Sequence, residues 1–159
     1  MSAPTLLPVL KDIAAHLEAL LEVLRLEYQA LSENHREGIE QAARDKNRLT
    51  GLLEDLEKER VTVLRGAGLD LDRSGVMAYL SRHDRPLQDP VSRLWQQIEE
   101  LSQSCEQQNR TNGIVIEHNR RHTETALTIL QGQTAETELY SASGNTVSSS
   151  ARQSIATKA

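Results

Sequence analysis

The fold of this chain is decided by residues 89–131, which read DPVSRLWQQIEELSQSCEQQNRTNGIVIEHNRRHTETALTILQ. Asp89 can accept hydrogen bonds from the free backbone N–H groups at a helix start, and Pro90 is favoured as the first helical residue. The stretch therefore predicts one helix over residues 90–131. At a rise of about 1.5 Å per residue this helix would be about 60 Å long, too long for a small globular core. It must serve a bundle, a coiled coil or a partner.

One side of this predicted helix carries a seam whose positions advance in steps of three and four residues, as in a helix that packs along partner helices. The first half of the seam is apolar, whereas the second half mixes polar and apolar residues. Polar residues buried in a seam fix the register of packing; otherwise the seam is open to water or to a partner there. The seam consists of Val91, Leu94, Ile98, Leu101, Cys105, Gln108, Asn112, Val115, Asn119, His122, Ala126 and Ile129.

The middle of the long helix has more apolar surface than one seam can hide. Ile114, Val115 and Ile116 are consecutive and span about 200° of the helix, so some of this surface must meet a second neighbour or stand exposed. The preceding Asn112-Gly113 is a turn signal, but the seam keeps its phase across it, which favours a continuous helix. Because a glycine inside a helix costs about 1 kcal/mol relative to alanine, we expect another backbone to approach closely at Gly113.

Two further long helices precede this one. Residues 3–31 form a strongly amphipathic helix, with Ser2 or Thr5 as its candidate N-cap. Asn34 followed three residues later by Glu37 has the form of a capping box, which predicts a second helix over residues 34–65. A short loop between two long helices makes them antiparallel neighbours.

The second helix and the connector after it carry three more local signals. Lys46 and Arg60 lie in the seam of the second helix, and we expect their stems to cover apolar neighbours while their charges reach water. Gly66-Ala67-Gly68 supplies a left-handed helix end. Ser74 is then the candidate cap of a short connector helix over residues 75–81.

The last residues differ in composition from the rest. Residues 132–159 are rich in Ser and Thr and poor in large apolar side chains, which cannot offset the entropy of an ordered chain. The predicted fold is therefore all-α: an elongated antiparallel bundle of three long helices with a short connector helix, over residues 1–131, followed by a flexible polar tail, residues 132–159.

Composition narrows the functional classes. The net charge of −5 gives no electrostatic case for binding nucleic acid or an anionic membrane. A single cysteine excludes an internal disulfide and suggests a reducing compartment. Neither a secretion signal nor an apolar run long enough to span a membrane is found, so the sequence predicts a cytoplasmic protein.

No set of residues has the pattern of a catalytic or metal site. A di-iron site in a helical bundle needs Glu-x-x-His pairs, and none of the five histidines has a glutamate three residues before it. His118 and His122 are one turn apart, but Arg120 and Arg121 between them disfavour a cation. Cys105 lies on the apolar seam, where a cysteine is more often a core residue than a nucleophile. The sequence therefore predicts no enzyme, no cofactor and no metal.

Four segments of the C-terminal third resemble FlgN-type flagellar export chaperones, and so does the order of the predicted helices. The resemblance implies a cytoplasmic type III secretion chaperone that holds the hook-associated proteins of the hook-filament junction before export. It also implies that the C-terminal third binds the disordered or helical ends of these proteins. The four segments are Asn109-x-x-Asn112-Gly113-x-x-Ile116, Arg120-Arg121-x-Thr123, Leu127-x-x-Leu130 and Leu139-Tyr140-x-x-x-Gly144.

The predicted binding mode places an amphipathic client helix in an apolar groove, closed over by the tail. A structural coiled-coil protein that self-associates, as a homodimer for example, is the alternative function. Export-apparatus components are left open as further partners. The predicted partner-binding residues are Asn109, Asn112, Gly113, Ile114, Ile116, Leu127, Leu130, Leu139 and Tyr140.

Overall fold

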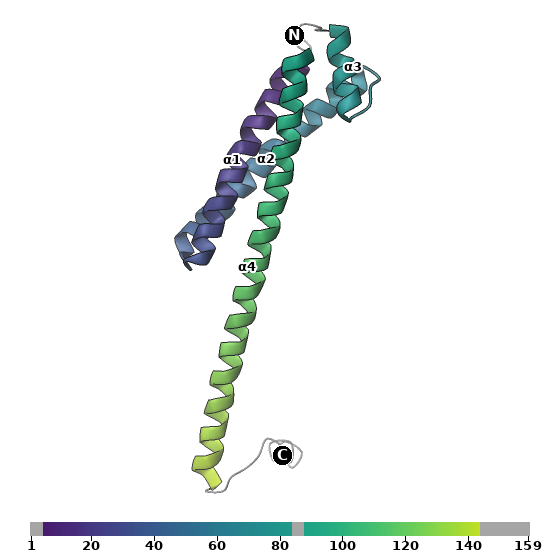
Figure 1. Cartoon of the computed structure of the whole chain (residues 1–159). Coiled ribbons are helices and arrows are strands. Elements are labelled where there is room, and N and C mark those ends of the chain that lie inside the picture. The colour runs from purple at the N-terminus through teal and green to yellow at the C-terminus, as the bar shows by residue number, and fades with distance from the viewer. Residues whose placement is uncertain (1–4, 84–87, 144–159) are drawn as a thin grey trace. The chain divides into compact units, whose positions relative to one another are not determined.

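The computed structural model describes the backbone of residues 5–83 and 88–143, and the side chains of residues 5–83 and 90–132. It contains four helices, α1 (Leu6–Ser32), α2 (Arg36–Gly66), α3 (Arg73–His83) and α4 (Gln88–Ser143) (Figure 1). These residues form no strand, so the all-α prediction is confirmed. None of the described helices has an apolar stretch of the length and hydropathy needed to cross a membrane.

Contacts within the chain divide it into two units, residues 1–115 and residues 116–159. The first unit holds α1, α2, α3 and the first half of α4. The second unit holds the rest of α4. The boundary therefore falls inside the long helix, not at residue 131, where the bundle was predicted to end.

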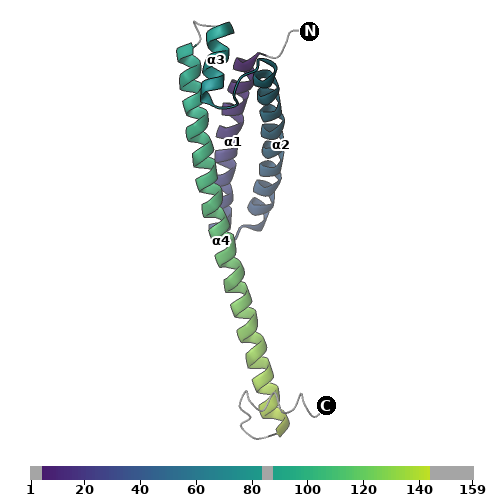
Figure 2. The same ribbon diagram turned by 90° about the vertical axis from the view of Figure 1, so that its right-hand side faces the viewer.

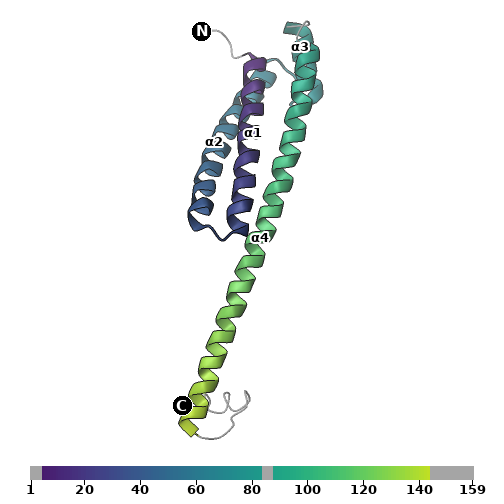
Figure 3. The same ribbon diagram turned by 60° about the vertical axis from the view of Figure 1, so that its left-hand side comes forward.

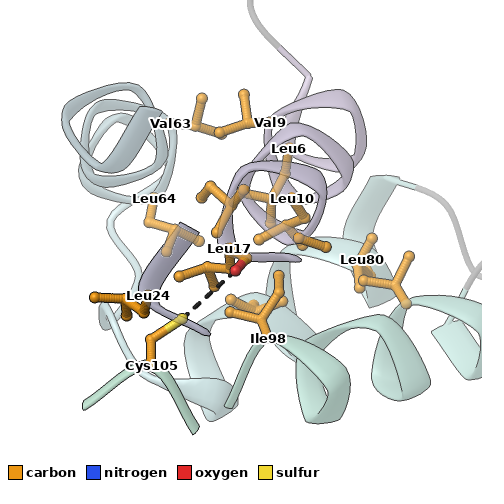
Figure 4. Packing of buried hydrophobic residues seen from close by; sticks show 14 residues of the cluster. Leu6, Val9, Leu10, Leu17, Leu24, Val63, Leu64, Leu80, Ile98 and Cys105 are labelled. Carbon is orange, nitrogen blue, oxygen red and sulfur yellow. Dashed lines mark hydrogen bonds between the residues drawn. The ribbon is translucent and has the colours of Figure 1, made fainter. Parts of the chain in front are cut away.

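The core of the first unit is built around α1. Figures 2 and 3 view the molecule from different sides, and both place α1 between α2 and the first half of α4. The close view in Figure 4 shows side chains from all four helices meeting around α1. The buried cluster consists of Leu6, Val9, Leu10, Ile13, Ala14, Leu17, Leu24, Val63, Leu64, Val76, Leu80, Val91, Ile98 and Cys105.

In the turn between α1 and α2, the cap of α2 lies one residue later than the predicted capping box places it. Asn34 adopts a left-handed conformation, with φ of 52°, and the N–H of His35 bonds the carbonyl of Ala30 at 2.9 Å. This is the usual way to close a helix C-terminus, with asparagine in the position that glycine most often takes. Because Asn34 ends α1, His35 caps α2 instead: its Nδ1 accepts from the N–H of Gly38 at 3.0 Å. The prediction of Asn34 as the cap is wrong.

The connector confirms one local signal and corrects another. Gly68 has φ of 67° and ends α2 as the Gly66-Ala67-Gly68 run predicts. The cap of α3, however, is Asp72 and not Ser74, because Asp72 Oδ1 accepts both from the N–H of Gly75 at 3.1 Å and from the Ser74 hydroxyl at 2.7 Å. These hydrogen bonds lower the pKa of the Asp72 carboxyl.

The long helix is continuous and extends further than predicted. It runs without a break through Asn112-Gly113, as the constant phase of the seam indicates, and ends at Ser143 and not near residue 131. Residues 132–143 include Ala, Glu and Leu, all good helix formers, and no proline. The prediction of a flexible tail rests on the Ser and Thr content, and it overestimates the entropy cost of ordering these residues. The rest of the predicted tail, residues 144–159, lies outside the described residues.

Candidate partner-binding surface

Asn112, one of the predicted partner-binding residues, is buried in the first unit. Only 1% of it is exposed, and its Nδ2 donates to the carbonyl of Leu24 at 2.8 Å and to Glu27 Oε2 at 2.7 Å. Gln108 donates to Asn112 Oδ1 at 3.0 Å. The other oxygen of the buried Glu27 accepts from Lys46 Nζ at 2.8 Å. A polar cluster of residues from α1, α2 and α4 thus crosses the apolar core.

This polar cluster fixes how α4 lies along α1. A slide of α4 by one turn, about 5.4 Å, would take Asn112 out of reach of Glu27 and leave a buried carboxylate short of a donor. The side chain of Asn112 is therefore occupied within the fold, and it offers a partner no contact surface. The prediction that Asn112 binds a partner is therefore wrong. Asn112 instead sets the register of α4 along α1.

Arg60 and Lys46 do not send their charges into water as predicted. Lys46 pairs with Glu27 in the polar cluster. Arg60 is buried: it donates to both oxygens of Glu57 and to the carbonyl of Leu71, and its guanidinium carbon lies 5.4 Å from the centre of the Trp95 ring. A bidentate carboxylate and an aromatic face satisfy the guanidinium inside the protein. A lysine in place of Arg60 could not make both contacts. Both residues therefore hold the first unit together.

Gly113 and Asn109 lie on the outside of the first unit. Nothing stands within 4 Å of the position that a Cβ on Gly113 would occupy, so the predicted close approach of another backbone is wrong. The side of α4 that carries Gly113 is exposed, and no packing compensates for the glycine. Asn109 is exposed and lines a cavity of about 400 Å³ beside Leu20, Leu24 and Cys105.

The apolar residues predicted to meet the client are exposed. The exposed fractions are 65% for Ile114, 46% for Ile116, 53% for Leu127 and 60% for Leu130. Ile129, a seam position that is not among the predicted partner-binding residues, is also 55% exposed. The polar residues Asn119 and His122 in the same part of the seam were the signal that could have revealed it. Leu139 and Tyr140 belong to the last turns of α4, and their side chains lie outside the description.

In the part of the second unit whose side chains are described, residues 116–132, the charged side chains pair with one another. Glu117 accepts hydrogen bonds from Arg120 and Arg121 at 2.8 and 3.0 Å, and Arg120 also pairs with Glu124. Hydrogen bonds from Arg120 and Arg121 lower the pKa of the Glu117 carboxyl to about 2. Pairs spaced three and four residues apart stabilise a helix that has no core of its own.

Catalytic and metal chemistry find little support among the described side chains. Cys105 is buried and its Sγ contacts the carbonyl of Leu17 at 3.5 Å (Figure 4). Burial raises the pKa of its thiol, which is the opposite of what a nucleophile needs. Within residues 5–83 and 88–143, no three His, Cys, Asp or Glu side chains gather closely enough to hold a metal ion.

The chain also matches the model of a known protein family. The model of the FlgN protein family matches residues 1–148. The chain belongs to the FlgN family. This family is involved in flagellar synthesis, and the resemblance found in the C-terminal third is confirmed.

A solved structure supports the same assignment. The chain is similar to a flagella synthesis protein FlgN from Pseudomonas aeruginosa, determined by crystallography. The two share 30% sequence identity with a TM-score of 0.66, and the match covers 82% of this chain and 98% of the other. No match is found among curated proteins. This chain is therefore similar in both fold and sequence to a flagella synthesis protein.

Proposed function

We propose that this FlgN-family chain is a cytoplasmic export chaperone that binds hook-associated proteins of the hook-filament junction and shields them before type III export. It binds without catalysis, and the client contributes amphipathic helical segments. Export-apparatus components are further candidate partners. The client contacts the apolar residues of α4 from Ile114 to Leu130. Leu139 and Tyr140, further along the same helix, extend this binding surface.

One observation carries this proposal. Residues 114–130 form a regular helix with five large aliphatic side chains between 46% and 65% exposed. Large exposed apolar patches are uncommon on monomeric proteins and mark interaction sites. A helix with an apolar face is also the usual partner of another amphipathic helix.

The direct test is a calorimetric titration of the full chain with purified hook-associated proteins of the same bacterium. We expect saturable binding, and we expect it to be lost when the client lacks its terminal helical segments. Truncation after Leu130 should keep the first unit folded and weaken binding, since Leu139 and Tyr140 would be gone. Absence of heat with every hook-associated protein would reject the proposal.

The alternative function, a structural coiled-coil protein, makes a different prediction for the same sample. Light scattering of the free chain would then report a stable homo-oligomer, and hook-associated proteins would not change its mass. A client complex with a defined mass, on the other hand, would favour the chaperone.

A further inference from the structure

Gly113 lies inside α4 without any of the usual structural reasons for a glycine. Among the described glycines, the one with a positive φ is Gly68. Nothing lies within 4 Å of the position that a Cβ on Gly113 would occupy, so no close approach requires it. It does not end a helix either, since α4 continues to Ser143. What remains is its effect on the helix itself, which is less stable with glycine than with alanine at this position.

The neighbours of Gly113 weaken the helix further. Residues 111–116 read TNGIVI, and we call them the weak segment. Four of the six are β-branched and lose side-chain freedom in a helix, and asparagine competes for backbone hydrogen bonds. The hydroxyl of Thr111 donates to the carbonyl of Gln107 at 3.1 Å, a bond that often bends a helix. Every residue of the weak segment is therefore a poorer helix former than alanine.

The helix on each side of the weak segment is stabilised separately. Arg110 pairs backwards along the chain with Glu106 at 3.2 Å. Glu117 pairs forwards with Arg120 and Arg121 at 2.8 and 3.0 Å. Such pairs, three and four residues apart, stabilise the turns that they span. Among the side chains of residues 5–83 and 90–132, no ion pair crosses the weak segment.

Burial ends within the weak segment. Asn112 is 1% exposed and is held by the carbonyl of Leu24 and by Glu27. After it, Ile114 and Ile116 are 65% and 46% exposed. An opening of the helix after Asn112 would break few apolar contacts, and water could bond the freed backbone groups, so its free energy is low. The division between the two units of the chain falls in the same place.

Gly51 in α2 shows that an open glycine alone does not weaken a helix in this way. Nothing lies within 4 Å of its Cβ position either, and the neighbouring Thr50 donates to the carbonyl of Lys46 at 2.8 Å. Core contacts, however, continue on both sides of it: Leu49 is 3% exposed, and Leu53 packs against the buried cluster. A bend at Gly51 would break these contacts, whereas Gly113 has buried neighbours on one side only.

We infer that the weak segment is a hinge, at which α4 bends while the helix on either side of it stays intact. The polar cluster around Asn112 holds the helix before the hinge, and the ion pairs of Glu117 hold the helix after it. Sharp bends in helices occur at glycine and at side chains that compete for the backbone hydrogen bonds. The hinge lets the exposed side chains after it change direction. It is a property of the free chain and does not depend on the proposed function.

The test measures the spread of distances across the weak segment. Spin labels on Arg48→Cys and Thr125→Cys, in the full chain with Cys105→Ala, report the distance from α2 to the second half of α4 by pulsed electron paramagnetic resonance. Labels on Arg48→Cys and Gln107→Cys form a reference pair that ends before the hinge. We expect a broad distance distribution for the first pair and a narrow one for the reference pair. Equally narrow distributions would overturn the inference.

Two glycine substitutions locate the bend. Gly113→Ala should narrow the distribution of the first pair, because alanine favours the closed helix about fivefold over glycine. Gly51→Ala is the matched control, since it makes the same change at another open helical glycine, and it should leave both distributions as they are. A distribution that stays equally broad in Gly113→Ala would overturn the inference.

Hydrogen exchange separates a hinge from a second half of α4 that unfolds as a whole. In the free chain, exchange should be fastest at the amides of residues 113–116 and slower again over residues 117–124, where the ion pairs of Glu117 lie. Gly113→Ala should slow exchange at residues 114–116 by about fivefold. Uniformly fast exchange from residue 113 to the end of α4 would overturn the inference, because the second half would then unfold instead of bending.

Discussion

The two halves of α4 have the same helical geometry and differ in what covers them. Ile98 in the first half is 7% exposed, whereas Ile116, about five turns further along and therefore in phase with it, is 46% exposed. Asn112 and Leu130 are separated by the same interval, and their exposed fractions are 1% and 60%. Spacing along a helix therefore shows which residues share a face, and burial depends on whether another element lies against that face.

The same contrast extends to the charges. In the first half, α1 lies beside α4, and the polar groups of Asn112 and Glu27 are satisfied across the interface between helices. In the second half, Glu117 and its arginines are satisfied within one helix. The first half is built to hold the fold and the second half is built to remain helical by itself. A helix that is ordered before binding avoids part of the entropy cost of association.

The largest expected effect tests whether the two halves differ in stability. Ile98→Asp should lower the free energy of unfolding by about 4 kcal/mol, because it buries an unpaired carboxylate in the core. Ile116→Asp, in phase with it, should change that free energy by no more than about 0.5 kcal/mol. Thermal melts followed by circular dichroism measure both. Equal losses would mean that the second half also packs in the core.

A smaller effect is expected at the polar cluster. Asn112→Ala should lower the free energy of unfolding by about 2 kcal/mol, since the buried Glu27 loses a donor and Gln108 loses an acceptor. Urea unfolding of Asn112→Ala, Glu27→Gln and the double variant gives the coupling energy between the two residues. Strictly additive effects would show that Asn112 does not set the register through Glu27.

The comparison of the two halves also shows which features of the structure could be predicted from the sequence. The seam correctly predicted the buried positions Val91, Ile98 and Cys105, because an apolar residue at each step has few alternatives to a core. It left open whether Ile129 is buried, because the spacing of apolar residues along α4 does not state how much of that helix another helix covers. The bonds of Asn112 were beyond prediction for a similar reason: its partner Glu27 is 85 residues away in the chain and looks like an ordinary surface residue in its own helix.

Removal of a helix cap is expected to lower the free energy of unfolding by less than a substitution in the core. His35→Ala removes the acceptor for the N–H of Gly38 and should cost about 1 kcal/mol, whereas His35→Asn keeps a cap and should cost less. Urea unfolding of the two variants side by side checks this. Should both variants behave like the native chain, the His35 cap would contribute nothing to the first unit.

The smallest effect concerns pH and the second half of α4. The pKa of Glu117 is lowered from 4.5 to about 2, so its stabilising contribution is present above pH 4.5 and is lost as the pH falls towards 2. Carboxyl NMR shifts should therefore show Glu117 titrating near pH 2 in the native chain. In Arg120→Ala the midpoint should rise towards 4.5. An unchanged midpoint would mean that Arg120 does not hold this carboxylate.

The central claim is that one half of α4 holds the fold while the other half holds the partner. The most direct test is a calorimetric titration of a hook-associated protein into Ile116→Asp, with a thermal melt of the same sample. We predict a melt like that of the native chain and an affinity lower by about 100-fold, because the new carboxylate must be desolvated in the complex. Native affinity in the folded Ile116→Asp variant would contradict the claim and move the client site away from the second half of α4.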